Sequence, residues 1–443
     1  MLRSLAHFSA ARSLLGALLF AIGMGTILLK IPFCHLGSIA WIDALFTSAS
    51  CLCICGLNTV SFTSFTTLGQ FVLLVLMQIG GLGLVTLTFF FMSFFIKFGF
   101  TTQVIAGQLM ELESWKDIKK FIFFIIAFTT IIELIGACGT FLSIYPDYSL
   151  LRAIFLSLFH AVATFCDAGI CLFPQGMISY KDHSVMLLFD SLIMVSAGLG
   201  FITWYELFNY VKNIGNKKRF HFSLQTKIVF LMTIVLVIGT VLLYWMLERA
   251  NTLAHMSAGS AFINALFNGI ASRGTGFSTV YFDQLQMATI LLIMVISFIG
   301  SAPGSTGSGI KVTTTAIYIA LIKAAIVGRT TVSMRGRTIA RDQVFKAVAI
   351  FSLSLLWIIV TSFFLLITEE GWPFIDIVFE SVSAFATLGL STGITSSLSI
   401  MGKIFIIMSM IAGRLGVFAF VLALHKRSDV PEFSYPEERV IIG

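Results

Sequence analysis

A glycine-rich stretch, GSAPGSTGSGIK from Gly300 to Lys311, contains the residue types of a phosphate site. Gly304 and Gly309 are separated by four residues and a lysine follows closely, which is near the spacing of a phosphate-binding loop. Such a loop requires the lysine directly after the second glycine and a β-strand before the first. Here Ile310 intervenes and an apolar, helix-like segment precedes the stretch. The sequence therefore disfavours nucleotide binding and leaves this stretch to be explained by its position.

Four other glycines recur at equivalent places in four similar segments. Each segment begins with an apolar, helix-like stretch rich in Phe, Ala and Ser and then reaches a glycine that an apolar residue follows. The segments are DALFTSASCLCICGLNTVSF from Asp43, FLSLFHAVATFCDAGICLFP from Phe155, FINALFNGIASRGTGFSTVYF from Phe262 and DIVFESVSAFATLGLSTGIT from Asp376. Their glycines are Gly56, Gly169, Gly276 and Gly389, spaced by 113, 107 and 113 residues. A near-constant period over almost the whole chain indicates four repeats of one unit.

The chemistry that this unit offers is cation coordination by backbone carbonyls. Each helix-like stretch is too short to cross a membrane, so it enters and returns, and non-helical backbone at membrane depth is tolerated only where protein covers it or it lines water. Free carbonyls there can replace the hydration shell of an ion, and the C-terminal end of a half-helix carries partial negative charge. Glycine reaches unusual backbone angles and leaves room. Ordinary loop glycines, the alternative, would not recur in four equivalent places.

The elements that must position these glycines are membrane spans. The chain has 443 residues, 58% hydrophobic and 11% charged, whereas soluble domains average about 25% charged residues. A span needs roughly 20 mostly apolar residues. Eight segments supply them: Ser13–Leu29, Phe65–Ile96, Phe121–Tyr145, Met186–Val211, Ile228–Leu247, Gln284–Ile310, Ala347–Thr368 and Ile404–Leu424. We therefore predict an all-α polytopic membrane protein with eight transmembrane helices and four re-entrant half-helices, in four helix–pore-loop–helix repeats around one central pore.

Charge placement predicts the orientation of these spans. Basic residues cluster after the second, fourth and sixth spans, in 97–120, 212–219 and 329–346. The positive-inside rule places these loops in the cytoplasm, so both termini are expected there too. Topology explains the basic loops better than nucleic-acid binding does. The N-terminal apolar stretch is too long for a signal peptide and lacks a clear small-residue cleavage site, so we expect it to be retained as the first span.

Reactive residues do not form an enzyme-like pattern. The seven cysteines, among them CLCIC at Cys51–Cys55 and the pair Cys166 and Cys171, lack the paired spacing of a zinc site and are expected to pack as small apolar residues. The seven histidines are scattered and no pair of acids is evident. An intramembrane protease or lipid transferase would need such a constellation. We therefore predict no enzyme activity and no organic cofactor on this chain.

At these motifs the sequence resembles the Trk/Ktr/HKT superfamily of cation transporters, and most of all the Ktr-type membrane subunit. The resemblance covers roughly residues 12 to 424 and rests on the four pore segments and on QIGGLGLVTL (Gln78–Leu87), SRGTGFSTV (Ser272–Val280), GSAPGSTGSGIKVTT (Gly300–Thr314), ESVSAFATLGLSTG (Glu380–Gly393) and AGRLG (Ala412–Gly416). It implies repeats at 1–97, 98–212, 213–328 and 329–424, followed by a cytoplasmic tail at 425–443.

The resemblance also implies a function and partners. It implies potassium uptake across the cytoplasmic membrane through a filter one ion wide, by a homodimer in membrane lipid on a cytosolic ring of nucleotide-binding regulatory subunits (KtrA/TrkA-like). The filter would be lined by Cys55, Gly56, Asp167, Ala168, Gly169, Thr275, Gly276, Leu388 and Gly389. A sodium transporter on the same fold is the alternative. In the plant branch, serine at the first filter position accompanies sodium transport, and glycine at that position here favours potassium.

Two filter residues depart from the family pattern. Cys55 stands where the family usually has threonine, and Cys166–Asp167 where it usually has two asparagines. An ionised Asp167 beside the filter would strengthen cation attraction. The alternative is that Asp167 caps the chain or pairs locally, for example with Arg273. The sequence leaves both possibilities open.

The opening stretch lies inside a span that is too long. From Gln284 to Val327 one helix would measure about 65 Å at about 1.5 Å per residue, twice a bilayer core of about 30 Å. Proline and glycines disfavour a helix, so we expect a break. The resemblance implies an intramembrane gate at 300–309 beneath the filter, formed by Gly300, Pro303, Gly304, Ser305, Thr306, Gly307, Ser308, Gly309, Lys311 and Arg414. A guanidinium inside a span is costly, and contact with the loop carbonyls would satisfy Arg414.

Overall fold

The computed structural model describes residues 10–83, 115–214, 221–424, 436 and 438. The predicted tail at 425–443 and the end of the second predicted span lie almost entirely outside these residues. Within the described part the chain is helical, apart from a hairpin of two-residue strands, β1 (Ser333–Met334) and β2 (Arg337–Thr338), paired antiparallel.

The helices fall into four units of the same plan: a first helix, a half-helix and a second helix. The first helices are α1 (Ala10–Lys30), α6 (Trp115–Ile144), α10 (Leu224–Glu248) and α14 (Arg341–Thr368). The half-helices are α2 (Trp41–Leu52), α7 (Leu150–Phe165), α11 (Ala258–Ala271) and α15 (Phe374–Ala386). The second helices begin with α3 (Thr67–Leu82), α8 (Ser184–Gly198), α12 (Met287–Phe298) and α16 (Ile400–Leu415). The 3-10 turns are η2 (Pro32–Cys34), η3 (Phe62–Ser64), η4 (Gly176–Tyr180), η5 (Phe282–Gln284) and η6 (Ile394–Ser397).

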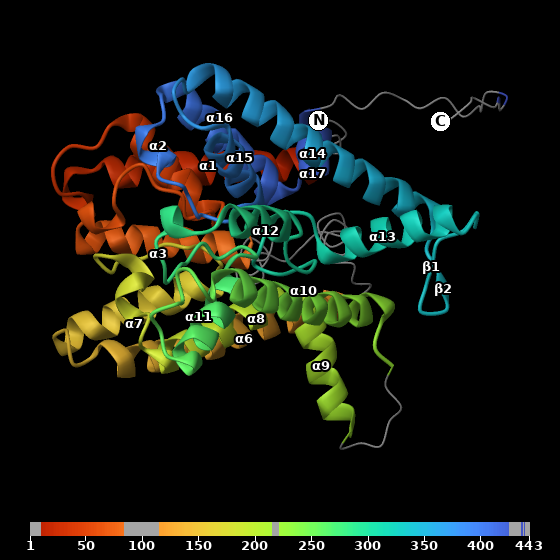
Figure 1. The fold of residues 1–443 in the computed structure, drawn as a ribbon, viewed down its shortest axis with the longest axis horizontal. Coiled ribbons are helices and arrows are strands. Elements are labelled where there is room, and N and C mark those ends of the chain that lie inside the picture. The colour runs from red at the N-terminus through yellow and green to blue at the C-terminus, as the bar shows by residue number, and fades with distance from the viewer. Residues whose placement is uncertain (1–9, 84–114, 215–220, 425–435, 437, 439–443) are drawn as a thin grey trace.

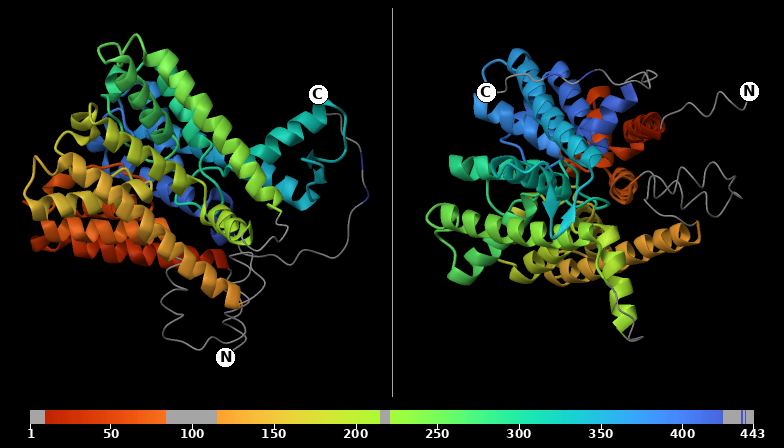
Figure 2. Two further views of the ribbon diagram at one scale, coloured as in Figure 1. Left: turned by 90° about the horizontal axis from the view of Figure 1, so that it is seen from below. Right: turned by 90° about the vertical axis from the view of Figure 1, so that its right-hand side faces the viewer.

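The four units surround a common centre. In Figure 1 the first and fourth units, red to orange and blue, occupy the upper half and the second and third, yellow and green, the lower half. The right-hand view of Figure 2 shows them around one axis. Three elements project from this body: α9 (Phe201–Ile214), α13 (Val312–Ile326) and the β1–β2 hairpin.

The first helix of every unit is long and apolar enough to cross a membrane. These stretches are Arg12–Lys30, Lys120–Ile144, Leu224–Glu248 and Arg341–Thr368, with mean hydropathies of 1.9 to 2.6. Among the described residues they are the continuous spans, and two bent helix pairs, α8 with α9 and α16 with α17 (Val417–Leu424), add two more if each is taken as one span. The second helices are shorter or broken.

The fourth and eighth predicted spans are bent rather than straight. The helix axis bends by 95° between α8 and α9 and by 106° between α16 and α17. Gly200 and Gly416 lie at these bends, each with φ of +82°, a left-handed conformation that interrupts a helix and that glycine adopts without a Cβ clash. Gly83 ends α3 with φ of +80°.

Buried carboxylates join the first helix to the second helix in the third and fourth units. Glu248, at the end of α10, accepts hydrogen bonds from the Gln286 backbone amide at 3.0 Å and from the Thr289 hydroxyl at 2.5 Å. Glu369, just after α14, accepts bonds from the amide and hydroxyl of Ser399 at 3.0 and 2.6 Å. These acceptors hold the N-termini of α12 and α16. The two helices that flank each of the half-helices α11 and α15 are therefore fixed relative to one another.

Candidate ion pathway

The four predicted filter glycines share one backbone conformation. Their φ angles are +90° at Gly56, +64° at Gly169, +71° at Gly276 and +87° at Gly389. A side chain is rarely tolerated in this left-handed region, because its Cβ approaches the backbone. The turn that each glycine makes follows directly on the C-terminal end of a half-helix.

These glycines form a closed ring. In each unit, the space that a β-carbon would fill is taken by the carbonyl oxygen of the residue before the glycine of the next unit: Gly56 faces Ala168, Gly169 faces Thr275, Gly276 faces Leu388 and Gly389 faces Cys55. A β-carbon on Gly56 would lie 2.6 Å from the Ala168 oxygen. The fourth unit therefore closes onto the first, and four backbone carbonyls are gathered at one level around one axis.

The half-helix ends produce this backbone by the same local hydrogen bond in three units. The amides of Cys55, Ala168 and Leu388 each donate to the carbonyl five residues earlier, at 2.8 Å. This is the longer bond of a Schellman motif, in which the chain leaves the helix through a left-handed residue. That residue is Ile54, Asp167 or Thr387, with φ of +53°, +55° and +51°. The third unit differs, because the Thr275 amide bonds to Ala271 at 3.0 Å.

Buried side chains hold the ring from behind. Asn268 donates to the Thr279 hydroxyl at 2.7 Å and accepts from the Thr279 amide at 3.0 Å. Glu380 accepts bonds from the hydroxyls of Ser391, at 2.9 Å, and of Thr395. Since both acceptors are side chains of half-helices, they brace the stretch that follows each glycine and keep the carbonyls in place before any ion arrives.

The Cys55 side chain packs inside the protein. It is fully buried, and its sulfur lies 3.9 Å from the carbonyl oxygen of Ser383 on the neighbouring half-helix. All seven cysteines are free thiols. Within the described residues, no three His, Cys, Asp or Glu side chains are grouped as metal ligands would be.

Asp167 joins the ring to the predicted gate. Its carboxylate oxygens accept one bond from the hydroxyl of Thr275, at 2.8 Å, and one from that of Thr306, at 3.0 Å. The side chain is 4% exposed. It forms no ion pair with Arg273, whose Nε and Nη2 atoms are buried without a hydrogen-bond partner among the described residues. Arg273 nevertheless lies near enough for its charge to interact with that of Asp167, while the direct hydrogen bonds come from the two threonines.

The glycine-rich stretch forms a loop between α12 and α13. Its two ends are tied together, because the Ile310 amide donates to Phe298 and the Val312 amide to Ser301, both at 3.2 Å. Within the loop, the Ser305 hydroxyl donates to the Ala302 carbonyl at 2.6 Å. Gly300 has no room for a side chain, since the Ser308 carbonyl fills that space. Gly307 is likewise closed off by Ser301, and Gly309 has φ of +72°.

The loop docks on the bend between α8 and α9. The Phe201 amide donates to the Gly304 carbonyl at 2.8 Å, and the Ala302 amide donates to Gly198 at 3.1 Å. A β-carbon on Gly200 would lie 2.7 Å from the Pro303 oxygen. Residues of this bend were absent from the sequence-based site. The sequence carries a recurring pattern at the C-terminal ends of α3, α8 and α16, namely GGLG at 80–83, AGLG at 197–200 and GRLG at 413–416.

Two basic side chains satisfy loop carbonyls. Arg414, in the last turn of α16, donates from Nη1 to the Thr306 carbonyl at 2.6 Å and to the Ser308 hydroxyl at 3.2 Å, and from Nη2 to the carbonyl of Gly80. Lys311 donates to the Gly307 carbonyl at 2.7 Å. Arg414 therefore links the loop to the ends of α3 and α16, in addition to the loop's contact with α8 and α9.

A cavity of about 730 Å³ lies against the loop. Pro303 and Gly304 form part of its wall, and the rest is mainly apolar, with Phe201, Ile202, Ile228 and Ile317 among its lining residues. Thr306, by contrast, reaches Asp167 beside the glycine ring. The loop thus has one part at the ring and another at a separate cavity.

Known proteins are similar to this chain in sequence and in fold. Residues 20–433 match the family model TrkH, described as a cation transport protein. The chain is 33% identical to the Ktr system potassium uptake protein B of Bacillus subtilis, over 95% of this chain and 94% of that protein. It is 31% identical to the potassium/sodium uptake protein NtpJ of Enterococcus hirae, over 95% and 94% of the two chains.

A solved structure supports the fold independently. The crystal structure of the potassium transporter TrkH from Vibrio parahaemolyticus superposes with a TM-score of 0.73 and 21% identity, over 95% of this chain and 86% of that one. The all-α, multi-pass membrane architecture expected from the sequence is thereby confirmed. The family is one of transporters rather than enzymes, as expected. Because the family model matches residues 20–433 and the named relatives match 95% of the chain, this chain belongs to the TrkH family of cation transport proteins.

Proposed function

We propose that this chain takes up potassium across the cytoplasmic membrane as the ion-conducting subunit of a Trk/Ktr-type transporter. The observation that carries the proposal is the closed ring in which each of four glycines faces the carbonyl of the next unit. Carbonyl oxygens on a rigid ring can replace water around a weakly hydrated cation. The relatives named for potassium uptake support the choice of ion.

Sodium is the second candidate. One relative is named a potassium/sodium uptake protein, and two side chains at the ring, Cys55 and Asp167, differ from the pattern expected for the family. Asp167 lies at the ring with both oxygens hydrogen-bonded. Gly56, which leaves the first position without a side chain, favours potassium.

We infer that the loop at 300–309 is the gate. Its Thr306 reaches the ring through Asp167, while Pro303 and Gly304 face the cavity, so the loop stands between the two. Arg414 holds it with hydrogen bonds to Thr306 and Ser308. Hydrogen bonds to a charged group contribute roughly 1.5–3 kcal/mol each, and about 1.4 kcal/mol changes an equilibrium tenfold. Loss of these bonds would therefore favour the open state strongly.

The proposed assembly follows the relatives' names. Two Bacillus subtilis relatives are named Ktr system potassium uptake proteins B and D, and the word system suggests more than one component. We propose that this chain likewise forms a homodimer in the membrane and works with a cytosolic nucleotide-binding subunit. Two of the predicted basic loops begin or lie on projecting elements, since Lys212 is in α9 and Arg337 in β2. With those loops in the cytoplasm, both termini are cytoplasmic as well.

Ion flux tests the proposal. Purified protein in proteoliposomes is given equal gradients of potassium or sodium, and uptake is measured with and without Gly56→Ser. We expect potassium flux to exceed sodium flux and the serine variant to lower that ratio. Empty liposomes control for leak. Sodium flux equal to or above potassium flux in the unaltered protein would favour the sodium alternative, and no flux of either ion would refute conduction by this chain alone.

A further inference from the structure

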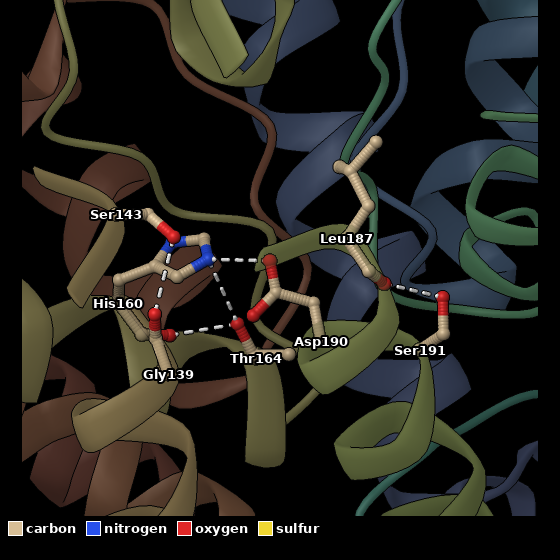
Figure 3. A network of polar contacts seen from close by, with 7 residues as sticks. All are labelled: Gly139, Ser143, His160, Thr164, Leu187, Asp190 and Ser191. Carbon is tan, nitrogen blue, oxygen red and sulfur yellow. Dashed lines mark hydrogen bonds and ion pairs between the residues drawn. The ribbon is translucent and has the colours of Figure 1, made fainter. Parts of the chain in front are cut away.

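A buried histidine–aspartate pair lies within the second unit. His160 is on the half-helix α7 and Asp190 on α8, and His160 Nε2 lies 3.0 Å from Asp190 Oδ2. The two side chains are 3% and 0% exposed. Figure 3 shows the imidazole edge turned to the carboxylate, with the Thr164 hydroxyl beside it. That hydroxyl donates to the His160 carbonyl at 2.8 Å, so it offers the carboxylate no bond of its own.

The pair is incompletely satisfied. Asp190 Oδ1 and His160 Nδ1 are buried and have no hydrogen-bond partner in the described part of the chain. An ionisable residue at membrane depth is costly and points to a function. With a neutral imidazole and an ionised carboxylate, the pair carries a net charge of −1, and one added proton brings it to zero. Because the pair is buried, a change in its charge is poorly screened by solvent.

The pair stands directly behind the filter. His160 precedes Gly169 by nine residues, as Glu380 precedes Gly389. Glu380 braces the stretch after its glycine through Ser391. His160 instead packs its ring 5.1 Å, between centroids, from that of Phe277, the residue after Gly276. A charge at this position therefore lies one side-chain layer from the ring of carbonyls.

Few other charged groups face the pair. α3, α6 and α11 pack against α7 and α8, and neither α3 nor α11 carries a titratable side chain. Glu133 of α6 accepts a bond from Gln78. Asp167, at the far end of α7, is held by Thr275 and Thr306. Cys171, half-buried after the filter, is near enough to Asp190 for their charges to interact.

We propose that His160 and Asp190 form a proton-binding site whose occupancy opposes cation occupancy of the filter; this rests on the proposed function. The negative charge of the deprotonated pair favours a cation in the carbonyl ring, and a proton on the pair removes that attraction. By linkage, the cation and the proton each weaken binding of the other. As pH falls, the pair gains its proton and the half-saturating potassium concentration rises. As pH rises, the proton leaves and the concentration falls.

The test is potassium flux in proteoliposomes at several potassium concentrations, from about pH 5.5 to about pH 8.5, a range that spans ordinary histidine titration. For the unaltered protein we expect the half-saturating concentration to fall roughly fivefold or more with rising pH, the lower end of ordinary coupling factors. Asp190→Asn holds the pair neutral, so it should show the high value at every pH. His160→Gln leaves the carboxylate without its proton-sharing partner and should move the transition to lower pH. His183→Gln, at an exposed histidine that begins α8, is the matched control and should titrate as the unaltered protein does.

The outcomes separate this inference from the function on which it rests. No potassium flux at any pH refutes the proposed function. Flux with a half-saturating concentration that is independent of pH, or that keeps its full pH dependence in both Asp190→Asn and His160→Gln, overturns the proton site. A dependence that disappears only in Asp167→Asn assigns the proton to Asp167 and overturns it too. If Asp190→Asn does not fold, as judged by gel filtration, the shifted transition in His160→Gln decides.

Discussion

The carboxylate of Asp167 accepts a hydrogen bond of 3.0 Å from the hydroxyl of Thr306, although 139 residues separate them. Asp167 lies two residues before a glycine of the carbonyl ring, and Thr306 lies in the loop between α12 and α13. Thr306 also offers its carbonyl to Arg414. One residue of the loop is therefore held both by the ring and by the last turn of α16, so ring and loop cannot move independently.

The carbonyl ring predicts that Gly389→Ala abolishes potassium flux. The new β-carbon would collide with the Cys55 carbonyl and open the ring. Gly393→Ala is the matched control, because Gly393 has a similar φ, +102° against +87°, but open space around its β-carbon. Both variants bear the backbone strain of about 1–2 kcal/mol of a left-handed residue, and only Gly389→Ala should lose conduction. Equal flux in the two folded variants would contradict the ring.

Asp167→Asn should raise the half-saturating cation concentration. The variant keeps an acceptor for Thr275 or Thr306 but loses negative charge beside the ring. Since salt screens such a field, the effect should be greater at low ionic strength. The measurement is flux against cation concentration at two ionic strengths. Asp182→Asn, at an exposed aspartate, is the control. An effect of the same size at both ionic strengths would give Asp167 a packing role.

Loss of the Arg414 contacts should open the gate. Arg414→Ala removes the bonds to Thr306 and Ser308, and deletion within Ser305–Ser308 shortens the obstruction itself. Each should raise flux by roughly tenfold, the effect of one lost bond of about 1.4 kcal/mol. Combined, they should be less than additive because they act on one element. The measurement is flux per folded protein in the bilayer. Unchanged flux in both single variants would show that the loop is not the gate.

The bend between α8 and α9 predicts a second way to move the loop. Gly200→Ala would push a β-carbon against the Pro303 carbonyl, 2.7 Å away, and displace the loop from its contact with the bend between α8 and α9. Gly416→Ala is an unusually close control, since both glycines have φ of +82° and Gly416 has nothing within 4 Å of its β-carbon. We expect higher flux from Gly200→Ala alone. If both variants gave the same flux, any change would result from backbone strain at the bend and not from the lost contact between the bend and the loop.

By itself, the sequence determined the membrane class, the four-unit plan and the break in the sixth span. These follow from properties that act over short stretches. Apolar runs of span length mark helices, while glycine and proline disfavour them in Gly300–Gly309. The recurrence of Gly56, Gly169, Gly276 and Gly389 at a near-constant period marked equivalent places without any knowledge of their contacts.

Only the tertiary structure decided which groups meet. The sequence allowed Arg273 as a partner for Asp167, and the fold places its charge nearby but gives both hydrogen bonds to the hydroxyls of Thr275 and Thr306. The recurring AGLG and GRLG patterns mark the places of Gly200 and Gly416 but do not predict a bend there, since a glycine within an apolar run is compatible with a straight helix. At Gly200 the loop at Pro303 and Gly304 fills the space beside the bend. Contacts of this kind depend on the packing of all four units together, which no local stretch encodes.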